Sequence, residues 1–410
     1  MEWGGDVSAS RPRVLAVSSQ IPWPLDRGGH IRTYHMLKGL SRSFDVSLIA
    51  GDHPDAATAV DELADAGVRC LPVRLESRTA IAELARAARS ALANEPYVLF
   101  GRHDRRQMRD EIGRHAAAEA FDLLYLDHLD SMVFANLARS RPIVVDMHNV
   151  CSVLLRRRAA EERRGVTRAY LRRESSLLAA MEQRAARTTS AVFAVSEQER
   201  RHFAALGARQ TFLVPNGVDC AAYVSADRAP DRRAPLIVFV GTMSWMPNAS
   251  AAAYLCRDFL PAVRRQIPDA RVRIIGRDPT ADLLALAHHP GVEVVGRVPD
   301  VRPHLNEASL LAVPLDAGGG TRLKIIEAFA AGLPVVSTAV GSEGIDASDG
   351  EHLLVAERDQ FPDTVVRLLS DADLAGRLAH NAKQLALSRY DWNIIGQDAA
   401  RAMWSTLPGA

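Results

Sequence analysis

The sequence predicts an α/β protein built from two doubly wound, Rossmann-like domains. Its 410 residues exceed the size at which a single hydrophobic core is usual. Two series of short apolar segments alternate with segments of helical length. Such apolar segments, when helices separate them, are typical of parallel sheets that are covered on both faces. A polar, turn-rich stretch divides the two series and predicts a boundary between the domains.

The apolar segments predict where the strands lie. In the first series we expect strands at 14–17, 45–49, 68–73, 123–126, 143–146, 191–195 and 212–214. In the second we expect them at 236–240, 272–275, 292–295, 310–313 and 334–337. The domains are then 11–213 and 235–388, joined by a hinge or linker at 214–234. A C-terminal helix at 389–408 is expected to pack back on the N-terminal domain.

Composition narrows the class of protein. The net charge is +1, so the chain has no overall field suited to binding nucleic acid. Its 4 cysteines are scattered, which argues against disulfides and structural zinc. Residues 1–13 lack the apolar centre of a signal peptide, and no apolar run approaches the ~20 residues that span a bilayer. We expect a cytoplasmic protein.

A glycine-rich segment at 318–327 is the strongest functional motif. An apolar strand leads into Gly318, Gly319 and Gly320, and a helical pattern follows. Glycines let backbone N–H groups approach a ligand, and the helix start adds unpaired donors, which together suit a phosphate. Lys324 and Glu327 are three residues apart and share a helix face, offering a cation and a hydroxyl acceptor. The alternative is a plain strand-to-helix turn with a solvated ion pair.

Several segments together resemble the family-4 retaining glycosyltransferases of GT-B fold. They are LLAVPLDAGGGTRLKIIEAFAAGLPVVST at 310–338, VPNGVD at 214–219, FVGTMSWMPN at 239–248, IIGRDP at 274–279, VEVVGRVPDVRPHL at 292–305 and YDW at 390–392. The likeness extends over about residues 13 to 405. The GGGTRLKxxE form resembles a bacterial branch found with exopolysaccharide and surface-glycan pathways.

This resemblance implies an N-terminal acceptor domain and a C-terminal nucleotide-sugar domain that face each other across a cleft. It implies catalytic roles for His148, Arg322 and Lys324. It also implies that the donor contacts Gly28, Gly29, Gly296, Arg297, Val298, Gly318, Gly319, Gly320, Thr321 and Glu327. For His148 the alternative is a structural histidine that caps the next helix.

The sequence departs from the family at two points. Gly319 stands where the family has the first of two glutamates. The family's arginine and lysine after the first C-terminal strand are absent from 241–248, so Arg322 and Lys324 are expected to replace them. We assign no general base, because the leaving phosphate can take the acceptor's proton. The only D-x-D, at 371–373, opens a helix and is expected to cap it, so no metal or other cofactor is expected.

An arginine-rich segment lies at Arg156 to Arg187. It holds ten arginines against four glutamates. Such a segment could contact anionic lipid headgroups at the inner face of a membrane. A long, solvated helix is the alternative that we favour.

The sequence therefore predicts a retaining, metal-independent transferase. It would move a sugar from a nucleoside-diphosphate sugar to a hydroxyl acceptor on a glycan, a lipid-linked molecule or a small molecule. Two alternatives stay open: a sugar-nucleotide epimerase of GT-B fold, and a degenerate protein that binds sugar nucleotides without catalysis.

Overall fold

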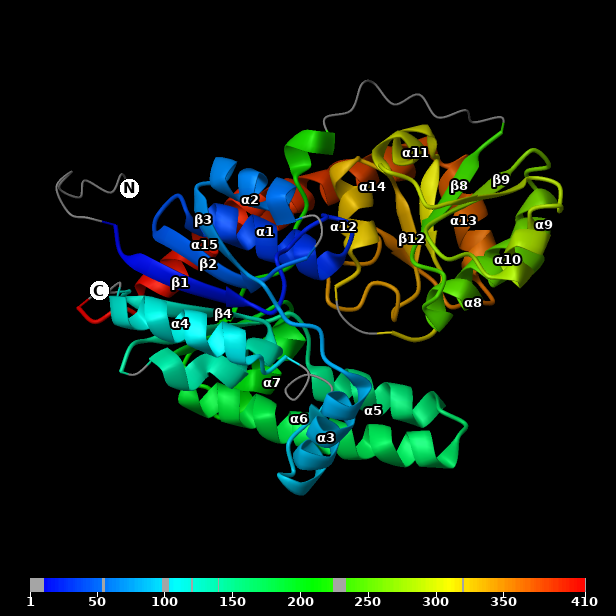
Figure 1. Cartoon of the computed structure of the whole chain (residues 1–410). Coiled ribbons are helices and arrows are strands. Elements are labelled where there is room, and N and C mark those ends of the chain that lie inside the picture. Colours follow the sequence, from blue (N-terminus) through cyan, green and yellow to red (C-terminus); the bar gives the residue numbers. More distant parts are fainter. Residues whose placement is uncertain are drawn as a thin grey trace. The chain divides into compact units, whose positions relative to one another are not determined.

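The computed structural model describes residues 11–53, 56–97, 103–118, 121–138, 140–223, 234–318 and 321–409. These form two compact units (Figure 1). Unit 1 comprises Met1–Pro215 together with Ile395–Ala410, and unit 2 comprises Asn216–Ile394. The predicted α/β class with two Rossmann-like domains is confirmed.

Unit 1 is built on a seven-stranded parallel sheet with the strand order β3-β2-β1-β4-β5-β6-β7. The strands are β1 (Arg13–Ser18), β2 (Asp45–Gly51), β3 (Val68–Val73), β4 (Leu123–Asp127), β5 (Ile143–Met147), β6 (Ala191–Ala194) and β7 (Thr211–Leu213). The helices are α1 (Gly28–Leu40), α2 (Ala56–Asp65), α3 (Ala80–Leu92), α4 (Arg106–Ala118), η2 (Leu129–Ala138), α5 (Cys151–Glu161), α6 (Gly165–Thr188) and α7 (Glu197–Ala205). In Figure 1, α1 and α2 cover one face of this sheet and α4 the other.

Unit 2 repeats the plan on a six-stranded parallel sheet with the order β10-β9-β8-β11-β12-β13. Its strands are β8 (Leu236–Val240), β9 (Arg271–Ile275), β10 (Val292–Gly296), β11 (Leu310–Val313), β12 (Val335–Ser337) and β13 (Leu354–Val355). Its helices are η3 (Cys220–Tyr223), α8 (Met246–Tyr254), α9 (Leu260–Arg264), α10 (Ala281–Leu286), α11 (Arg302–Glu307), α12 (Leu323–Ala330), α13 (Phe361–Ser370) and α14 (Ala372–Leu385). The π-helical turns η4 (Leu255–Phe259) and η5 (Ala386–Tyr390) continue α8 and α14.

Burial explains why the strands were readable in the sequence. All residues of β4, β6 and β11 are buried, and β1 is buried after its first residue. Both faces of such a strand pack under helices, so every position is apolar rather than every second one. Each strand predicted from the sequence is present within two residues of its expected bounds. Strand β13 was not predicted, because its two residues carry no periodic signal.

Both sheets reverse their strand order at the same place. The chain runs outward from β1 to β3 and then returns to add β4 beside β1, and unit 2 does the same with β8 and β11. Ligands of open α/β sheets bind beyond the carboxyl ends of the strands at such a reversal. We therefore expect functional residues directly after β1, β4, β8 and β11.

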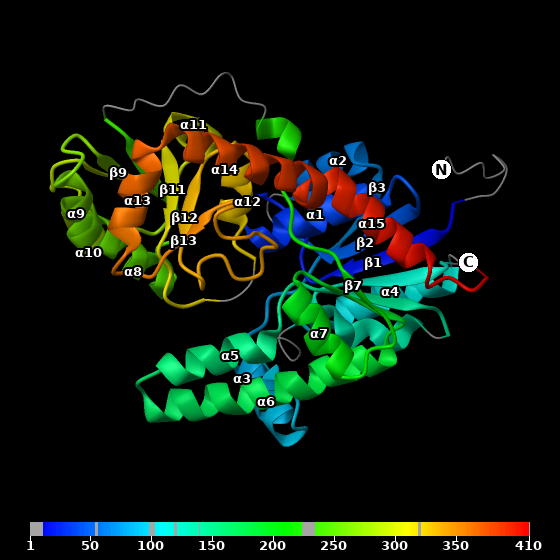
Figure 2. The ribbon, with the colours of Figure 1, turned by 180° about the vertical axis from the view of Figure 1, so that it is seen from behind.

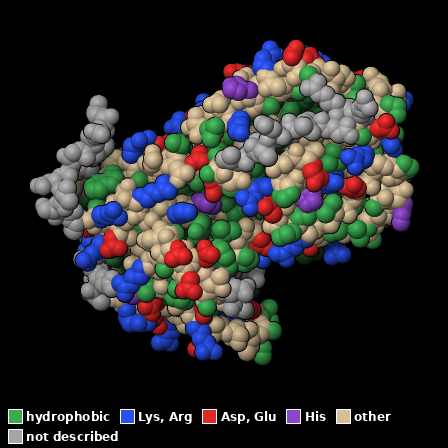
Figure 3. Space-filling model, turned by 90° about the horizontal axis from the view of Figure 1, so that it is seen from above, with side chains coloured by type: hydrophobic (Ala, Val, Ile, Leu, Met, Phe, Trp, Pro, Cys, Tyr) green, Lys and Arg blue, Asp and Glu red, His purple; other side chains and the backbone are tan. Residues whose placement is uncertain are grey.

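Part of the predicted linker, residues 224–233, lies outside the described residues. Basic and acidic side chains are interspersed over the face shown in Figure 3, in keeping with the net charge of +1. Within the described ranges, no helix combines the length and the apolar character needed to cross a bilayer.

The last helix, α15 (Trp392–Trp404), belongs to unit 1 from Ile395 onward (Figure 2). It crosses α1 where Gly39 meets Gly396. A Cβ atom on Gly39 would lie 2.6 Å from the Cα of Gly396, and a Cβ on Gly396 would lie 2.7 Å from the Cα of Gly39. The Trp404 ring lies 5.5 Å from that of Phe44. This crossing therefore requires glycine on both helices.

We predict that Gly39→Ala destabilises unit 1 by about 1–3 kcal/mol, because the new methyl group must displace backbone atoms of α15. Urea unfolding measures the change. The matched control is Gly113→Ala in α4, where nothing lies within 4 Å of the new Cβ. This control should leave stability unchanged or raise it by up to ~1 kcal/mol, because alanine favours the helix. Equal unfolding midpoints for the two variants would contradict the close crossing.

Candidate functional site

An open cavity of about 390 Å³ lies in unit 2 at the carboxyl ends of β8 and β11. The start of α12 forms one of its walls. The lining residues are Val240, Gly241, Trp245, Asn248, Leu315, Thr321, Arg322, Leu323, Lys324 and Glu327. The cavity therefore brings together four of the residues selected from the sequence, namely Thr321, Arg322, Lys324 and Glu327.

Lys324 lies in the first turn of α12 and is held from two sides. Its Nζ donates a hydrogen bond to Oδ1 of Asn248 at 3.0 Å and lies 4.2 Å from the centre of the Phe239 ring. The Asn248 amide is itself fixed, because its Nδ2 donates to the carbonyl of Thr242 at 3.0 Å. Burial, reinforced by the nearby Arg322 charge, lowers the pKa of Lys324 to about 7. Within the described part of the chain no carboxylate accepts a hydrogen bond from Lys324, so an anion entering the cavity would stabilise the ammonium form.

Glu327 lies one turn further along α12, on the same face. Tyr223 of η3 donates its hydroxyl to Oε1 of this carboxylate at 3.2 Å. Burial raises the pKa of Glu327 to about 7, although Tyr223 and Lys324 both act to lower it. Asp300 adds to the rise through its negative charge. The cavity thus holds a lysine and a glutamate whose charged forms are both poorly solvated.

The glycine segment before α12 is crowded at its first residue. Gly318 has φ +147°, and a Cβ there would lie 2.6 Å from Nη2 of Arg322 and 2.8 Å from the Trp245 ring. Arg322 is 5% exposed and donates from Nη2 to the carbonyl of Val340 at 3.3 Å. The hydroxyl of Thr321 is buried and has no hydrogen-bond partner among the residues that the structure describes. Gly319 and Gly320 lie outside the described residues.

The loop after β10 lies further from the cavity. Gly296 ends β10 with φ +78°, and β10 lies two strands away from β8. Neither Gly296 nor Arg297 nor Val298 lines the cavity. Arg302, the first residue of α11 after this loop, donates from Nη1 to the carbonyl of Ala222 at 3.3 Å. The start of α11 therefore contacts the residue next to Tyr223, the partner of Glu327.

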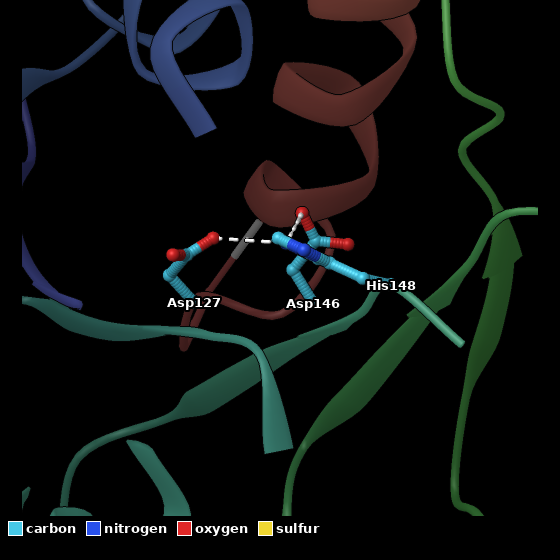
Figure 4. Close-up of side chains that lie close together, drawn as sticks. All are labelled: Asp127, Asp146 and His148. Carbon is cyan, nitrogen blue, oxygen red and sulfur yellow. Dashed lines mark hydrogen bonds and ion pairs between the residues drawn. The ribbon is translucent and has the colours of Figure 1, made fainter. Parts of the chain in front are cut away.

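A second cluster lies in unit 1, at the ends of β4 and β5. Asp127 ends β4, Asp146 lies in β5, and His148 follows β5. Figure 4 shows the imidazole of His148 directed at both carboxylates. Its Nε2 lies 3.0 Å from Oδ1 of Asp127 and 3.8 Å from Oδ2 of Asp146. The histidine therefore donates to Asp127, which leaves Nδ1 as the nitrogen available to a ligand.

Asp146 forms a buried ion pair with Arg32 of α1. Arg32 Nε lies 3.0 Å from Oδ2 and Nη2 lies 2.6 Å from Oδ1, and the two side chains are 1% and 0% exposed. Tyr125 donates its hydroxyl to Oδ2 at 2.7 Å. Burial alone would raise the pKa of Asp146, but Arg32, His148 and Tyr125 outweigh it and lower that pKa. The Asp146 carboxylate is therefore ionised, and both of its oxygens accept hydrogen bonds.

The three side chains have the composition of a metal site, since one potential ligand atom of each lies within 4.8 Å of the others. Their oxygens, however, already accept hydrogen bonds. Asp127 accepts from the hydroxyls of Ser18 at 2.8 Å and Thr33 at 2.9 Å, in addition to His148. Asp146 is occupied by a guanidinium, which would also repel a cation. The cluster therefore fits the orientation of an imidazole better than the binding of an ion.

The glycines predicted before α1 come close to this histidine. Gly28 and Gly29 form the first turn of α1, and a Cβ on Gly29 would lie 3.8 Å from Nδ1 of His148. His148 does not cap α5, whose N-cap residue is Val150. The backbone N–H of Ser152 in that helix instead donates to Glu182 of α6 at 2.9 Å. The alternative prediction that His148 caps the next helix is therefore wrong. Of the two predicted glycines, Gly29 lies beside His148.

Several residues of these sites were missed by reasoning from the sequence: Asn248, Tyr223, Arg32, Asp127 and Asp146. The two aspartates lie at the end of a predicted strand or just beyond it, which is a usable signal, whereas Asn248 lies in the first turn of α8. Tyr223 and Arg32 reach their partners from remote parts of the chain, and nothing in the local sequence marks them. Asp371 caps α14 by accepting from Leu374 N–H at 2.9 Å, as expected for the only D-x-D.

Two family models match the chain. One described as "Glycosyl transferase 4-like domain" matches residues 27–217, and one described as "Glycosyl transferases group 1" matches residues 234–371. A phosphatidyl-myo-inositol mannosyltransferase of Mycobacterium leprae is 28% identical over 220 residues, which make up 51% of this chain and 57% of that protein. The match thus spans little more than half of this relative.

Solved structures resemble the chain over nearly its whole length. A sucrose-phosphate synthase from Thermosynechococcus elongatus has a TM-score of 0.68 at 17% identity, covering 96% of this chain and 99% of that one. Anabaena HepE in complex with UDP has a TM-score of 0.66 at 16% identity, covering 96% of this chain and 100% of that one. At these identities the likeness shows the shared GT-B fold.

We predict that Arg32→Met destabilises the protein by about 3–5 kcal/mol, because it leaves Asp146 buried without its cation. Chemical denaturation measures the loss. Arg200→Met in α7 is the matched control, since Arg200 pairs with Glu197 at a partly exposed position. That change should cost less than ~1 kcal/mol. Similar losses for both variants would contradict the role given to the buried pair.

Proposed function

Because the chain belongs to the group 1 glycosyltransferases of GT-B fold, we propose that it transfers a sugar from a nucleoside-diphosphate sugar to a hydroxyl acceptor. We further propose that the reaction retains the anomeric configuration and needs no metal. The observation that carries the proposal is the desolvated Lys324 at the start of α12, with Glu327 one turn away. HepE of the same fold has been crystallised with UDP and with UDP-glucose, which supports this class of donor.

Lys324 and the α12 N-terminus suit the charge that the reaction creates. Breaking the bond between the sugar and the phosphate leaves negative charge on the departing diphosphate. The first backbone N–H groups of α12 and the ammonium of Lys324 would stabilise that charge in a poorly solvated cavity. Thr321 offers its buried hydroxyl beside them. Because these groups are already placed, little reorganisation accompanies the reaction.

Glu327 suits the sugar of the nucleoside. A carboxylate that receives one hydrogen bond, from Tyr223, keeps capacity to accept more from vicinal ribose hydroxyls. Tyr223 also fixes which way the carboxylate points. Glu327 would therefore contribute mainly to donor binding, and Lys324 to both binding and the reaction.

We assign His148 a contact with the donor sugar. Asp127 binds Nε2 and so directs Nδ1 toward the first turn of α1. Held in this way, the imidazole presents Nδ1 to a sugar hydroxyl. No group is given the role of general base, since the leaving phosphate can take the proton of the acceptor.

The same chemistry supports the proposal that no metal is needed. Lys324 supplies the cation near the expected diphosphate, and the carboxylates of unit 1 are engaged by Arg32 and by hydroxyls. We also propose a cytoplasmic protein, in line with its four free cysteines, three of which are buried. The arginine-rich segment at 156–187 is proposed to contact the inner face of a membrane.

We predict that Lys324→Met lowers kcat/KM for the donor by ~10²–10³-fold, the loss typical when one stabiliser of a developing charge is removed. Glu327→Gln should raise the donor KM by about tenfold with a smaller effect on kcat, because the lost contact is made before and during the reaction. Release of nucleoside diphosphate measures both. Lys383→Met in α14 is the matched control, because Lys383 does not line the cavity.

Unchanged turnover in both variants would refute the assigned site. The products separate the remaining functions. A sugar joined to an acceptor supports the transferase, whereas an isomerised sugar nucleotide indicates an epimerase. Tight nucleotide binding without turnover on any acceptor indicates a binding protein.

The pKa of Lys324 predicts proton uptake on binding. Its value of about 7 lies below the ordinary 10.5, so at pH 8 the free protein holds this side chain mostly neutral. A bound diphosphate favours the ammonium, and binding at pH 8 should therefore take up a proton, approaching one per site. At pH 6 the lysine is already charged, and this uptake disappears.

Calorimetry of nucleoside-diphosphate binding in buffers of different ionisation enthalpy measures the uptake. Lys324→Met should abolish it at pH 8, and Lys383→Met should leave it intact. Proton uptake that persists in Lys324→Met would show that another group titrates.

A further inference from the structure

The segment after β8, residues 241–248, lines part of the unit 2 cavity but carries no lysine or arginine. It contributes the amide of Asn248, which lies in the first turn of α8. Asn248 is 6% exposed, so this polar side chain is buried. Buried polar groups are satisfied by hydrogen bonds, and the partners of Asn248 indicate its role.

The Asn248 amide has one orientation that satisfies both of its partners. Its Nδ2 donates to the carbonyl of Thr242, and its Oδ1 accepts from Nζ of Lys324, each at 3.0 Å. A carbonyl only accepts and an ammonium only donates, so exchanging the two amide atoms would break both hydrogen bonds. Asn248 therefore presents an acceptor to Lys324 at a fixed position.

The amide lies directly against the backbone at the end of β8. A Cβ atom on Gly241 would lie 2.6 Å from Nδ2, 2.7 Å from Cγ and 2.9 Å from Oδ1 of Asn248. Gly241 is itself held, because its N–H donates to the carbonyl of Ile275 in β9 at 2.9 Å. The N–H of Asn248 donates to the carbonyl of Trp245 at 3.0 Å. The edge of the sheet thus sets where the acceptor for Lys324 lies.

The surroundings of Lys324 leave its charge uncompensated by this contact. Nζ lies 4.2 Å from the centre of the Phe239 ring, and its hydrogen bond goes to a neutral amide. Burial lowers the pKa of Lys324 to about 7, and the charge of Arg322 adds to this effect. Glu327, one turn along α12, opposes it. Asn248 therefore orients Nζ without neutralising its charge.

We infer that Asn248 is a positioning residue, which holds Nζ of Lys324 in place for the donor's diphosphate and leaves its positive charge to that ligand. A carboxylate at position 248 would also hold Nζ, but it would form an internal ion pair and repel the diphosphate. A side chain without an acceptor would leave the long lysine side chain free to adopt other rotamers. This role rests on the transfer proposed above and adds to it the residue that orients its cation.

The competing explanation is that Asn248 only closes the turn after β8, through its hydrogen bond to Thr242. Its loss would then reduce stability and activity whether or not Lys324 is present. A positioning role differs in this respect, because it acts through the lysine. A double-mutant cycle separates the two explanations.

Asn248→Ala should lower kcat/KM for release of nucleoside diphosphate about ten- to hundredfold, mainly through kcat, because a hydrogen bond to a charged group is lost. In the Lys324→Met background the same change should cost less than about twofold, since no ammonium remains to be placed. Asn381→Ala is the matched control. Asn381 Nδ2 also donates to a backbone carbonyl, that of Glu351, at 3.0 Å, and this residue does not line the cavity. The control should change turnover in neither background.

Asn248→Asp gives a second readout, which a merely structural role would not move. At pH 8 the wild-type lysine is mostly neutral before binding, so binding of a nucleoside diphosphate takes up a proton. The new carboxylate should raise the pKa of Lys324, so that the free protein already holds the ammonium and the uptake falls toward zero. Affinity for the diphosphate should fall at least about tenfold, because the ion pair must be broken. Asn248→Ala should retain the uptake.

Calorimetry of full-length variants with a nucleoside diphosphate, and their turnover, decide between the outcomes. Equal losses from Asn248→Ala with and without Lys324 would overturn the inference, as would wild-type proton uptake in Asn248→Asp. Undiminished turnover in Lys324→Met would refute the proposed site itself, and with it the role of Asn248. Failure of the inference alone is thus distinct, because Lys324→Met then still lowers kcat/KM.

Discussion

A parallel sheet places the carboxyl end of every strand at one edge, and both units depend on this constraint. In unit 1 it brings Ser18 of β1 beside Asp127 of β4, more than a hundred positions along the chain, and sets Asp146 of β5 next to them. In unit 2 it sets the start of α12 beside the loop after β8. Because the strand order reverses between β1 and β4 and between β8 and β11, the crossover helices diverge there and leave room for a ligand.

The two sites use burial in opposite ways. In the unit 1 cluster, Asp146 is matched by Arg32, and Asp127 accepts from two hydroxyls and an imidazole. In unit 2, Lys324 and Glu327 are both pushed toward their neutral forms. The first arrangement stabilises a fixed geometry. The second holds charges at a cost in stability that an anionic ligand can offset, which is the behaviour expected of a binding site.

The sequence was sufficient for the strands and for the principal motif. Apolar runs such as 310–313 are readable because both faces of the sheet are covered, and the spacing of Lys324 and Glu327 fixes their common face. The partners were not predictable. Asn248 is 76 residues from Lys324 and Tyr223 is 104 from Glu327, so their contacts depend on tertiary packing. The pairing of Gly39 with Gly396 depends on how α15 returns to unit 1.

In helix α6, the inward orientation of Glu182 affects both the packing of the interior and the charge of the outer surface. Glu182 turns inward and accepts from the backbone and the hydroxyl of Ser152, at 2.9 and 2.6 Å. It thereby fixes the start of α5, four residues after His148. Burial raises the pKa of Glu182, so the contact has an electrostatic cost. The same inward turn removes a negative charge from the outer face of α6. Arg168 and Arg172 remain exposed on α6, so this helix holds the start of α5 on its inner side while its outer side stays basic.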